Sequence, residues 1–123
     1  MGGKNMIYHC DVCGNLIEVI DEGVGTLECC GQPMLEIVAN TTEAASEKHV
    51  PVVVEVDGKI NVTVGSVEHP MTEDHYIEWI EVVFVDRICR FQLKPSDKPA
   101  AAFCASGKKY SVRAYCNLHG LWQ

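Results

Sequence analysis

The chain has 123 residues and a formal net charge of −7, and this length fits one ordinary domain or two small ones. The acidic balance argues against nucleic-acid binding, because nothing offsets phosphate repulsion over an extended face. No stretch approaches the roughly 18 apolar residues that a membrane span needs, and the first residues lack the apolar core of a signal peptide. We therefore expect a cytoplasmic protein without a membrane partner.

Residues 1–38 are expected to form a first, separate domain that is rich in Cys and Gly and poor in large apolar residues. Below about 40 residues a chain usually needs a metal, disulfides or a partner subunit to fold. A hairpin is expected between Ile17–Ile20 and Thr26–Glu28. A unit this small is expected to pack against its twin, which predicts a homodimer.

Seven cysteines are present, and in a reducing cytosol close cysteine spacings indicate metal binding or redox chemistry rather than disulfides. Four of them form two pairs, each followed by Gly: Cys10 with Cys13, and Cys29 with Cys30. Four thiolates in a small unit suit tetrahedral zinc or iron. Spacing alone does not choose between the two metals, so a zinc-stapled module fused to a domain that only binds partners is an alternative.

Residues 39–123 are expected to form a second, all-β domain after a polar linker with one helical turn at 40–47. Two β-branched runs, Val52–Val56 and Lys59–Val64, flank Asp57-Gly58, which is a strong hairpin signal. No later segment shows a sustained helical period. Several short strands at regular spacing predict an immunoglobulin-like antiparallel β-sandwich. The further strands are expected at 76–85, 88–93, 101–105 and 111–116.

Four histidines and one cysteine lie at the predicted strand ends and loops, where a scaffold usually carries function: His49, His69, His75, Cys116 and His119. Any one of these histidines alone would be interpreted as structural, and His9 beside Cys10 still is. However, the three-residue spacing of Cys116 and His119 lets one turn deliver a thiolate and an imidazole. Five ligands exceed the four of a closed zinc site and leave a sixth octahedral position open, which points to iron chemistry.

Four segments of the second domain together resemble the motifs of the desulfoferrodoxin family of superoxide reductases: Glu47–Pro51, Gly65–Met71, His75–Ile80 and Tyr115–Gly120. The N-terminal cysteine pattern is similar to the desulforedoxin-type domain of that family. The resemblance runs from about Tyr8 to Trp122 and favours iron over zinc at the four-cysteine site. It therefore implies two irons per chain, one bound by four cysteines and one by four histidines and a cysteine.

The resemblance further implies that the four histidines bind ferrous iron in a plane, with the Cys116 sulfur axial and superoxide at the open position. The implied reaction is one-electron reduction of superoxide to hydrogen peroxide, in oxygen-stress detoxification. Lys48 is then the local cation that attracts superoxide, and Glu47 the sixth ligand of the oxidised iron. A rubredoxin-like electron donor is also implied. A superoxide dismutase, which needs no external electrons, is the rival enzyme.

Two cysteines, Cys89 and Cys104, fall outside these motifs. We expect both to be buried small hydrophobic residues, with a cross-strand disulfide as the alternative.

Overall fold

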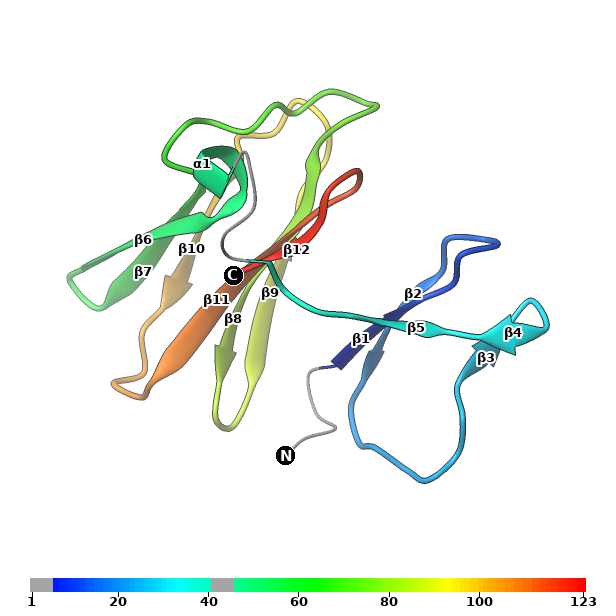
Figure 1. Cartoon of the computed structure of the whole chain (residues 1–123). Coiled ribbons are helices and arrows are strands. Elements are labelled where there is room, and N and C mark those ends of the chain that lie inside the picture. The colour runs from blue at the N-terminus through cyan, green and yellow to red at the C-terminus, as the bar shows by residue number, and fades with distance from the viewer. Residues whose placement is uncertain (1–5, 41–45) are drawn as a thin grey trace. The chain divides into compact units, whose positions relative to one another are not determined.

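The structure, a computed structural model, describes residues 6–40 and 46–123, without the side chains of Ser46 and Glu47 (Figure 1). The chain divides into two compact units, Met1–Val38 and Ala39–Gln123. Nearly all regular structure in the described residues is β. No helix among them is long and apolar enough to cross a membrane.

The small unit is a three-stranded antiparallel sheet and a two-stranded hairpin. The sheet has the order β2-β1-β5, and the hairpin joins β3 to β4. The strands are β1 (Met6–His9), β2 (Leu16–Val19), β3 (Glu28–Cys29), β4 (Gln32–Pro33) and β5 (Leu35–Ile37).

The hairpin predicted between Ile17–Ile20 and Thr26–Glu28 is wrong, because β2 pairs with β1 instead. The cysteine turn at residues 10–13 causes this pairing. In that turn the Gly14 amide donates to the Cys10 carbonyl at 2.9 Å, and the Cys10 amide donates to the Asn15 carbonyl at 2.9 Å. The chain therefore reverses directly after β1, and β2 is the first strand that reaches it.

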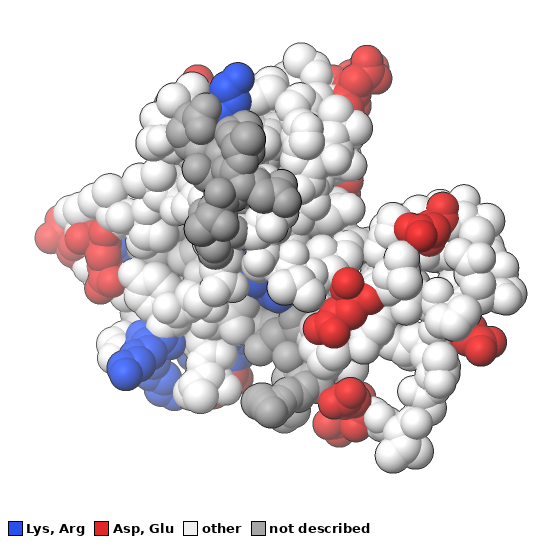
Figure 2. Space-filling view, in the orientation of Figure 1, with Lys and Arg blue, Asp and Glu red and all other residues white. Residues whose placement is uncertain are grey.

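Very little of the small unit is buried. Its buried hydrophobic residues among those described are Ile7 and Cys10, which are 3% and 1% exposed. Residues 6–38 contain no Lys or Arg, and the face of this unit seen in Figure 2 carries acidic side chains as its only charged groups. A unit with this composition has no core of its own to hold it together.

The larger unit is a sandwich of a three-stranded and a four-stranded antiparallel sheet, with orders β10-β7-β6 and β12-β11-β8-β9. This confirms the predicted mostly-β fold. Its elements are α1 (Ser46–His49), β6 (Pro51–Val56), β7 (Lys59–Val64), β8 (Ile77–Phe84), β9 (Ile88–Gln92), β10 (Ala100–Cys104), β11 (Tyr110–Cys116) and β12 (Gly120–Trp122).

The turn between β6 and β7 lies where the sequence predicts it, at Asp57-Gly58. Both residues have positive φ, 52° and 76°, as a two-residue hairpin turn of the favoured hand requires. Val56 faces Lys59 across it. The last strand, β12, was not predicted, because three residues after His119 are too short to show a period.

The core lies between the two sheets. Strand β7 alternates exposed and buried residues, and its inward side chains Ile60, Val62 and Val64 are at most 1% exposed. They belong to one cluster with Ile80 and Val82 of β8. Cys116, at the end of β11, is part of the same cluster and is fully buried. The core therefore anchors the base of the predicted histidine site.

A buried ion cluster attaches β11 to its neighbours. Glu81 in β8 is 0% exposed and accepts hydrogen bonds from Arg90 Nε in β9 at 2.8 Å and from Arg113 Nε in β11 at 2.6 Å. A buried carboxylate is tolerated when it is paired and hydrogen-bonded in this way. The cluster ties together β8, which follows the loop with His69 and His75, β9, and β11, which precedes the turn with His119.

The expectation of two buried cysteines is wrong for Cys104, which is exposed, whereas Cys89 is half-buried and packs against the core. Cys104 faces Lys59 at the end of β10, and Cys89 faces Val82 in the other sheet. All seven cysteines lie in the described residues, and none forms a disulfide. The alternative of a cross-strand disulfide is not found in this structure, where both thiols are free and their strands are not neighbours in one sheet.

Candidate metal centres

The four N-terminal cysteines come together at one end of the small unit. Cys10 and Cys13 lie in the turn after β1, and Cys29 and Cys30 lie in the β3–β4 hairpin. Their Sγ atoms all lie within 4.8 Å of one another. The Sγ of Cys29 lies 3.6 Å from that of Cys13 and 3.9 Å from that of Cys30. Tetrahedral bonds of about 2.3 Å would space the sulfurs by about 3.8 Å, so the cage has the size of a tetrahedral metal site.

Backbone conformation makes the cage possible. Cys30 and Gly31 both have positive φ, 55° and 77°, which lets neighbouring cysteines turn toward one centre. Gly31 takes this conformation at little cost, and Cys30 takes it as a strained residue. The amide Nδ2 of Asn15 also donates to the Cys29 Sγ at 3.6 Å.

Three of these thiols, those of Cys10, Cys29 and Cys30, have pKa values shifted in opposite directions. The Cys13 backbone amide is the main cause that lowers the pKa of Cys10 to about 7. The hydrogen bond with Cys13 is the main cause that raises the pKa of Cys30 to about 12, and the same partner raises the pKa of Cys29. The crowded sulfurs resist full ionisation without a positive ion, and a bound metal stabilises the thiolates. The donor set fits an iron or zinc ion.

The second centre is built from four separate segments of the sandwich. His49 ends α1, and His69 and His75 lie in the loop between β7 and β8. Cys116 ends β11, and His119 lies in the turn to β12. Residues 70 positions apart in the chain therefore converge at one end of the two sheets (Figure 1).

The four imidazole rings form a closed circle. Going round it, the ring centroids lie 4.7 Å apart from His49 to His69, 4.7 Å to His75, 5.0 Å to His119 and 4.9 Å back to His49. Each ring stands edge-on to the next, with interplanar angles between 69° and 80°. Such a circle surrounds one central point with four imidazoles, which is the arrangement of four equatorial ligands.

Ligand-atom distances agree with that arrangement. The Nε2 atoms of His49 and His69 lie 3.2 Å apart, close to the roughly 3.0 Å expected for two ligands at right angles with bonds of about 2.1 Å. The Sγ of Cys116 lies 3.7 Å from Nδ1 of His119. One ligand atom from each of His49, His75, Cys116 and His119 lies within 4.8 Å of the others. His69 is connected to this group by the short distance between its Nε2 atom and that of His49.

Neighbouring groups orient these ligands. Nδ1 of His69 lies 2.7 Å from the Pro70 carbonyl oxygen, and a proton donated there leaves Nε2 as the ligating atom. Trp122 stacks on the His49 ring at 4.6 Å and 18°. The Nε2 atom of His75 is buried and has no hydrogen-bond partner in the described part of the chain. A buried, unpartnered nitrogen that belongs to this circle is what a metal would satisfy.

Burial also keeps the imidazoles in their ligating form. It is the main cause that lowers the pKa of His69 to about 4, and it lowers the pKa of His75 in the same way. Both rings are therefore favoured as neutral bases. Burial raises the pKa of the Cys116 thiol, whereas the backbone amides of Leu118 and His119 oppose this by donating to the sulfur. A metal ion is the partner that ionises a buried thiol.

The exposed rim of the centre contains one described cation. Lys48 in α1 is exposed, and its charge contributes, after burial and two of the histidines, to the lowered pKa of His75. It therefore lies near the circle. His119 is also exposed, whereas His49, His69 and Cys116 are buried. The side chain of Glu47 lies outside the described residues.

Two residues of the site were missed by sequence reasoning. Trp122 was missed because β12 shows no sequence period. Asn117 was passed over although it stands between two proposed ligands, Cys116 and His119. Its position in that turn was the signal that could have identified it.

Comparisons with known proteins agree with both centres. The family model for desulfoferrodoxin matches residues 41–123, and that for the desulfoferrodoxin N-terminal domain matches residues 3–37. The chain is 54% identical over 117 residues to a desulfoferrodoxin homolog of Archaeoglobus fulgidus, covering 95% of this chain and 94% of that one. It is 50% identical over 123 residues to the desulfoferrodoxin of Nitratidesulfovibrio vulgaris, covering 100% and 98%.

Proteins named superoxide reductase match as well. The one from Pyrococcus abyssi is 34% identical over 110 residues, covering 73% of this chain and 95% of the relative. The crystal structure of the superoxide reductase from Treponema pallidum superposes with a TM-score of 0.76 at 28% identity, covering 99% of this chain and 98% of that one. The donor sets of both centres fit the two iron ions expected from the sequence.

Proposed function

Because the chain belongs to the desulfoferrodoxin family and is an oxidoreductase, we propose that it reduces superoxide by one electron to hydrogen peroxide. The closed circle of four imidazoles, with the buried Cys116 sulfur within 4.8 Å of three of them, is the observation that carries this proposal. The role is detoxification under oxygen stress. A module that only binds partners would have no use for such a donor set.

The proposed ligands of the catalytic iron are His49, His69, His75, His119 and Cys116. When bound, ferrous iron supplies the single electron of the reaction, in which superoxide, one electron and two protons yield hydrogen peroxide. Five protein donors leave one octahedral position for a small molecule. The exposure of His119 and Lys48 would let a small molecule reach such a position from solvent.

The proposed ligands of the other iron are Cys10, Cys13, Cys29 and Cys30. Their sulfur cage supports this assignment. All five ligands proposed for the catalytic iron belong to the other unit. We therefore propose that superoxide reduction itself needs only the sandwich.

Lys48 is proposed to attract superoxide and to hydrogen-bond the developing product with its ammonium group. The net charge of −7 repels an anion at long range, but charges more than about 8 Å away are largely screened at physiological salt. A nearby cation can therefore dominate the last part of the approach. Glu47 is proposed to occupy the open position in the oxidised resting state, and this rests on its place beside Lys48 and on the family resemblance.

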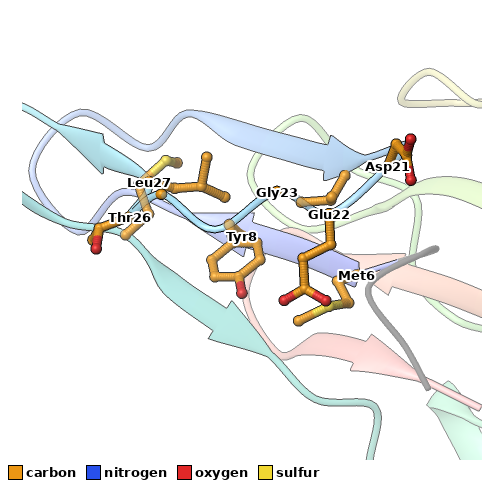
Figure 3. Close-up of a pocket in the computed structure, with 10 residues that line it drawn as sticks. Met6, Tyr8, Asp21, Glu22, Gly23, Thr26 and Leu27 are labelled. Atoms are coloured by element: carbon orange, nitrogen blue, oxygen red, sulfur yellow. The ribbon is translucent and has the colours of Figure 1, made fainter.

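We also propose a homodimer, a rubredoxin-like external electron donor and a reducing cytoplasmic setting. The dimer is supported by the poor burial in the small unit, where a hollow of about 340 Å³ opens among Met6, Tyr8, Val19, Leu27 and Met34. Figure 3 shows this hollow with Glu22 at its edge. The apolar part of its lining is open to water and is the kind of surface that a second copy would cover. The absence of disulfides among the seven cysteines is consistent with the cytoplasm.

Metal analysis, absorption spectroscopy and pulse radiolysis of the purified protein test the function together. We expect two irons per chain, visible bands from two sulfur-ligated sites, and peroxide as the product. Cys116→Ser should abolish the reduction of superoxide while the four-cysteine site stays coloured, because only the sulfur donor of the histidine centre is removed. Full activity in that variant would disprove the site, and steady oxygen release without a reductant would instead indicate a dismutase.

A further inference from the structure

His75 stands in a loop, just beyond the end of the sheet. The pairing of β11 with β8 ends where Cys116 faces Ile77, so the residues before Ile77 have no strand partner to hold them. The placement of one of the five proposed iron ligands depends on where this loop lies. The loop therefore needs some other attachment to the rest of the site.

The side chain of Asn117 provides that attachment on both sides of His75. Its Oδ1 accepts a hydrogen bond from the Tyr76 amide at 3.0 Å, and its Nδ2 donates to the Asp74 carbonyl at 3.0 Å. The Asn117 backbone amide also donates to the Tyr76 carbonyl at 3.2 Å. One carboxamide is thus hydrogen-bonded to the backbone of both the residue before His75 and the residue after it.

Thr72, in the same loop, forms the hydrogen bonds to the backbone of His75 itself. The backbone amides of Thr72 and His75 each donate to the other residue's carbonyl, at 3.0 and 3.2 Å. The Thr72 hydroxyl lies 3.2 Å from both the amide and the carbonyl of His75. The backbone of His75 is therefore fully hydrogen-bonded, whereas its ring nitrogen Nε2 is left without a partner among the described residues. The loop holds a fixed backbone that presents an unsatisfied ligand atom.

We propose that Asn117 is a positioning residue that couples the loop bearing His75 to the turn bearing Cys116 and His119, so that three of the five iron ligands move as one unit. This inference rests on the proposed function, since it concerns the same iron site. Asparagine suits the role because it offers a donor and an acceptor at one fixed spacing. Residues that orient metal ligands typically change metal affinity or activity by about 10- to 100-fold when mutated.

The test uses the iron-loaded full-length protein and two variants. Asn117→Ala removes both side-chain hydrogen bonds, and Asn117→Leu removes them while keeping the branched shape and the number of heavy atoms. Iron release to 2,2′-bipyridine is followed at the visible bands of the two centres separately. In both variants we expect release from the histidine centre to be about 10- to 100-fold faster and the sulfur-to-iron band of that centre to shift. Release from the four-cysteine centre should stay unchanged.

Asn61→Ala is the matched control, because the Asn61 side chain also donates to a backbone carbonyl, that of Val54 at 3.4 Å, within the sheet. This variant should release iron at the wild-type rate. Wild-type release and an unshifted band in the folded Asn117 variants would overturn the proposal. Equally faster iron release from both centres, or faster release in Asn61→Ala, would also overturn the proposal, because loosening of the whole fold would then explain the effect. If the alanine variant does not fold, the leucine variant decides by the same criteria.

The result is independent of the reaction with superoxide. A wild-type protein that binds iron but does not reduce superoxide would contradict the proposed function and leave the iron-release rates to decide the role of Asn117.

Discussion

The two units of the chain reach order by different physical means. The sandwich buries a continuous cluster of aliphatic and aromatic side chains between two sheets, and it places its histidines at the rim of that core. Among its described residues the small unit buries one aliphatic side chain, Ile7, and its four cysteines point at one another. In the sandwich, packing of the core therefore positions the metal ligands before a metal binds. In the small unit, binding of the metal must instead stabilise the fold.

The largest expected effect follows from removing one ligand of the small unit. Cys13→Ser should abolish iron binding at the four-cysteine site and with it the ordered structure of residues 6–38, because metal binding supplies the folding free energy of such units. Heteronuclear NMR spectra should lose the dispersed signals of this unit and keep those of the sandwich. Superoxide reduction with a chemical reductant should remain largely intact.

Cys104→Ser is the control for that experiment, since Cys104 is an exposed cysteine outside both clusters. It should leave both irons and both sets of signals unchanged. If activity disappears in Cys13→Ser while the histidine iron stays bound, the two units are not independent and the comparison fails.

The next effect concerns the core of the sandwich. Ile80→Ala removes a side chain that is 0% exposed and should lower the free energy of unfolding by about 2–5 kcal/mol. Denaturant unfolding followed by tryptophan fluorescence measures this, since both tryptophans lie in the sandwich. Val54→Ala, at a position 54% exposed, should cost less than about 1 kcal/mol. Similar losses in both variants would mean that the core does not hold this unit.

The smallest effect is expected at the rim of the site. Lys48→Ala should slow the reaction of the ferrous enzyme with superoxide by roughly 5- to 150-fold, toward the low end because the site is exposed to solvent. Added salt should slow the wild type more than the variant, since screening weakens only an attraction that is present. Pulse radiolysis at two salt concentrations measures both rates. Equal rates would leave Lys48 as an ordinary surface residue.

Glu47→Ala tests whether the adjacent carboxylate has a different role from the attraction of superoxide. It should leave the first encounter nearly unchanged, because a negative group does not help an anion to arrive. A shifted absorption band of the oxidised protein is expected instead. An unchanged oxidised spectrum would contradict the assignment of Glu47.

Residue identity and spacing were enough to predict the two units, the mostly-β fold and both sets of metal ligands as hypotheses. Cysteine pairs followed by glycine and the Cys116–His119 spacing are local signals, because one turn delivers both ligands. The Asp57-Gly58 turn was predictable for the same reason, since its backbone conformation depends on those two residues. The choice of iron depended on the combined motifs and their resemblance to a family.

Only the tertiary structure decided how distant segments meet. The pairing of β2 with β1, the exposure of Cys104 and the stacking of Trp122 on His49 depend on which strands become neighbours, and no local pattern specifies this. The same is true of Asn117, whose partners lie 41 and 43 residues away. Ligand identity is local chemistry, whereas ligand position depends on long-range hydrogen bonds and packing that exist only once the sheets have assembled.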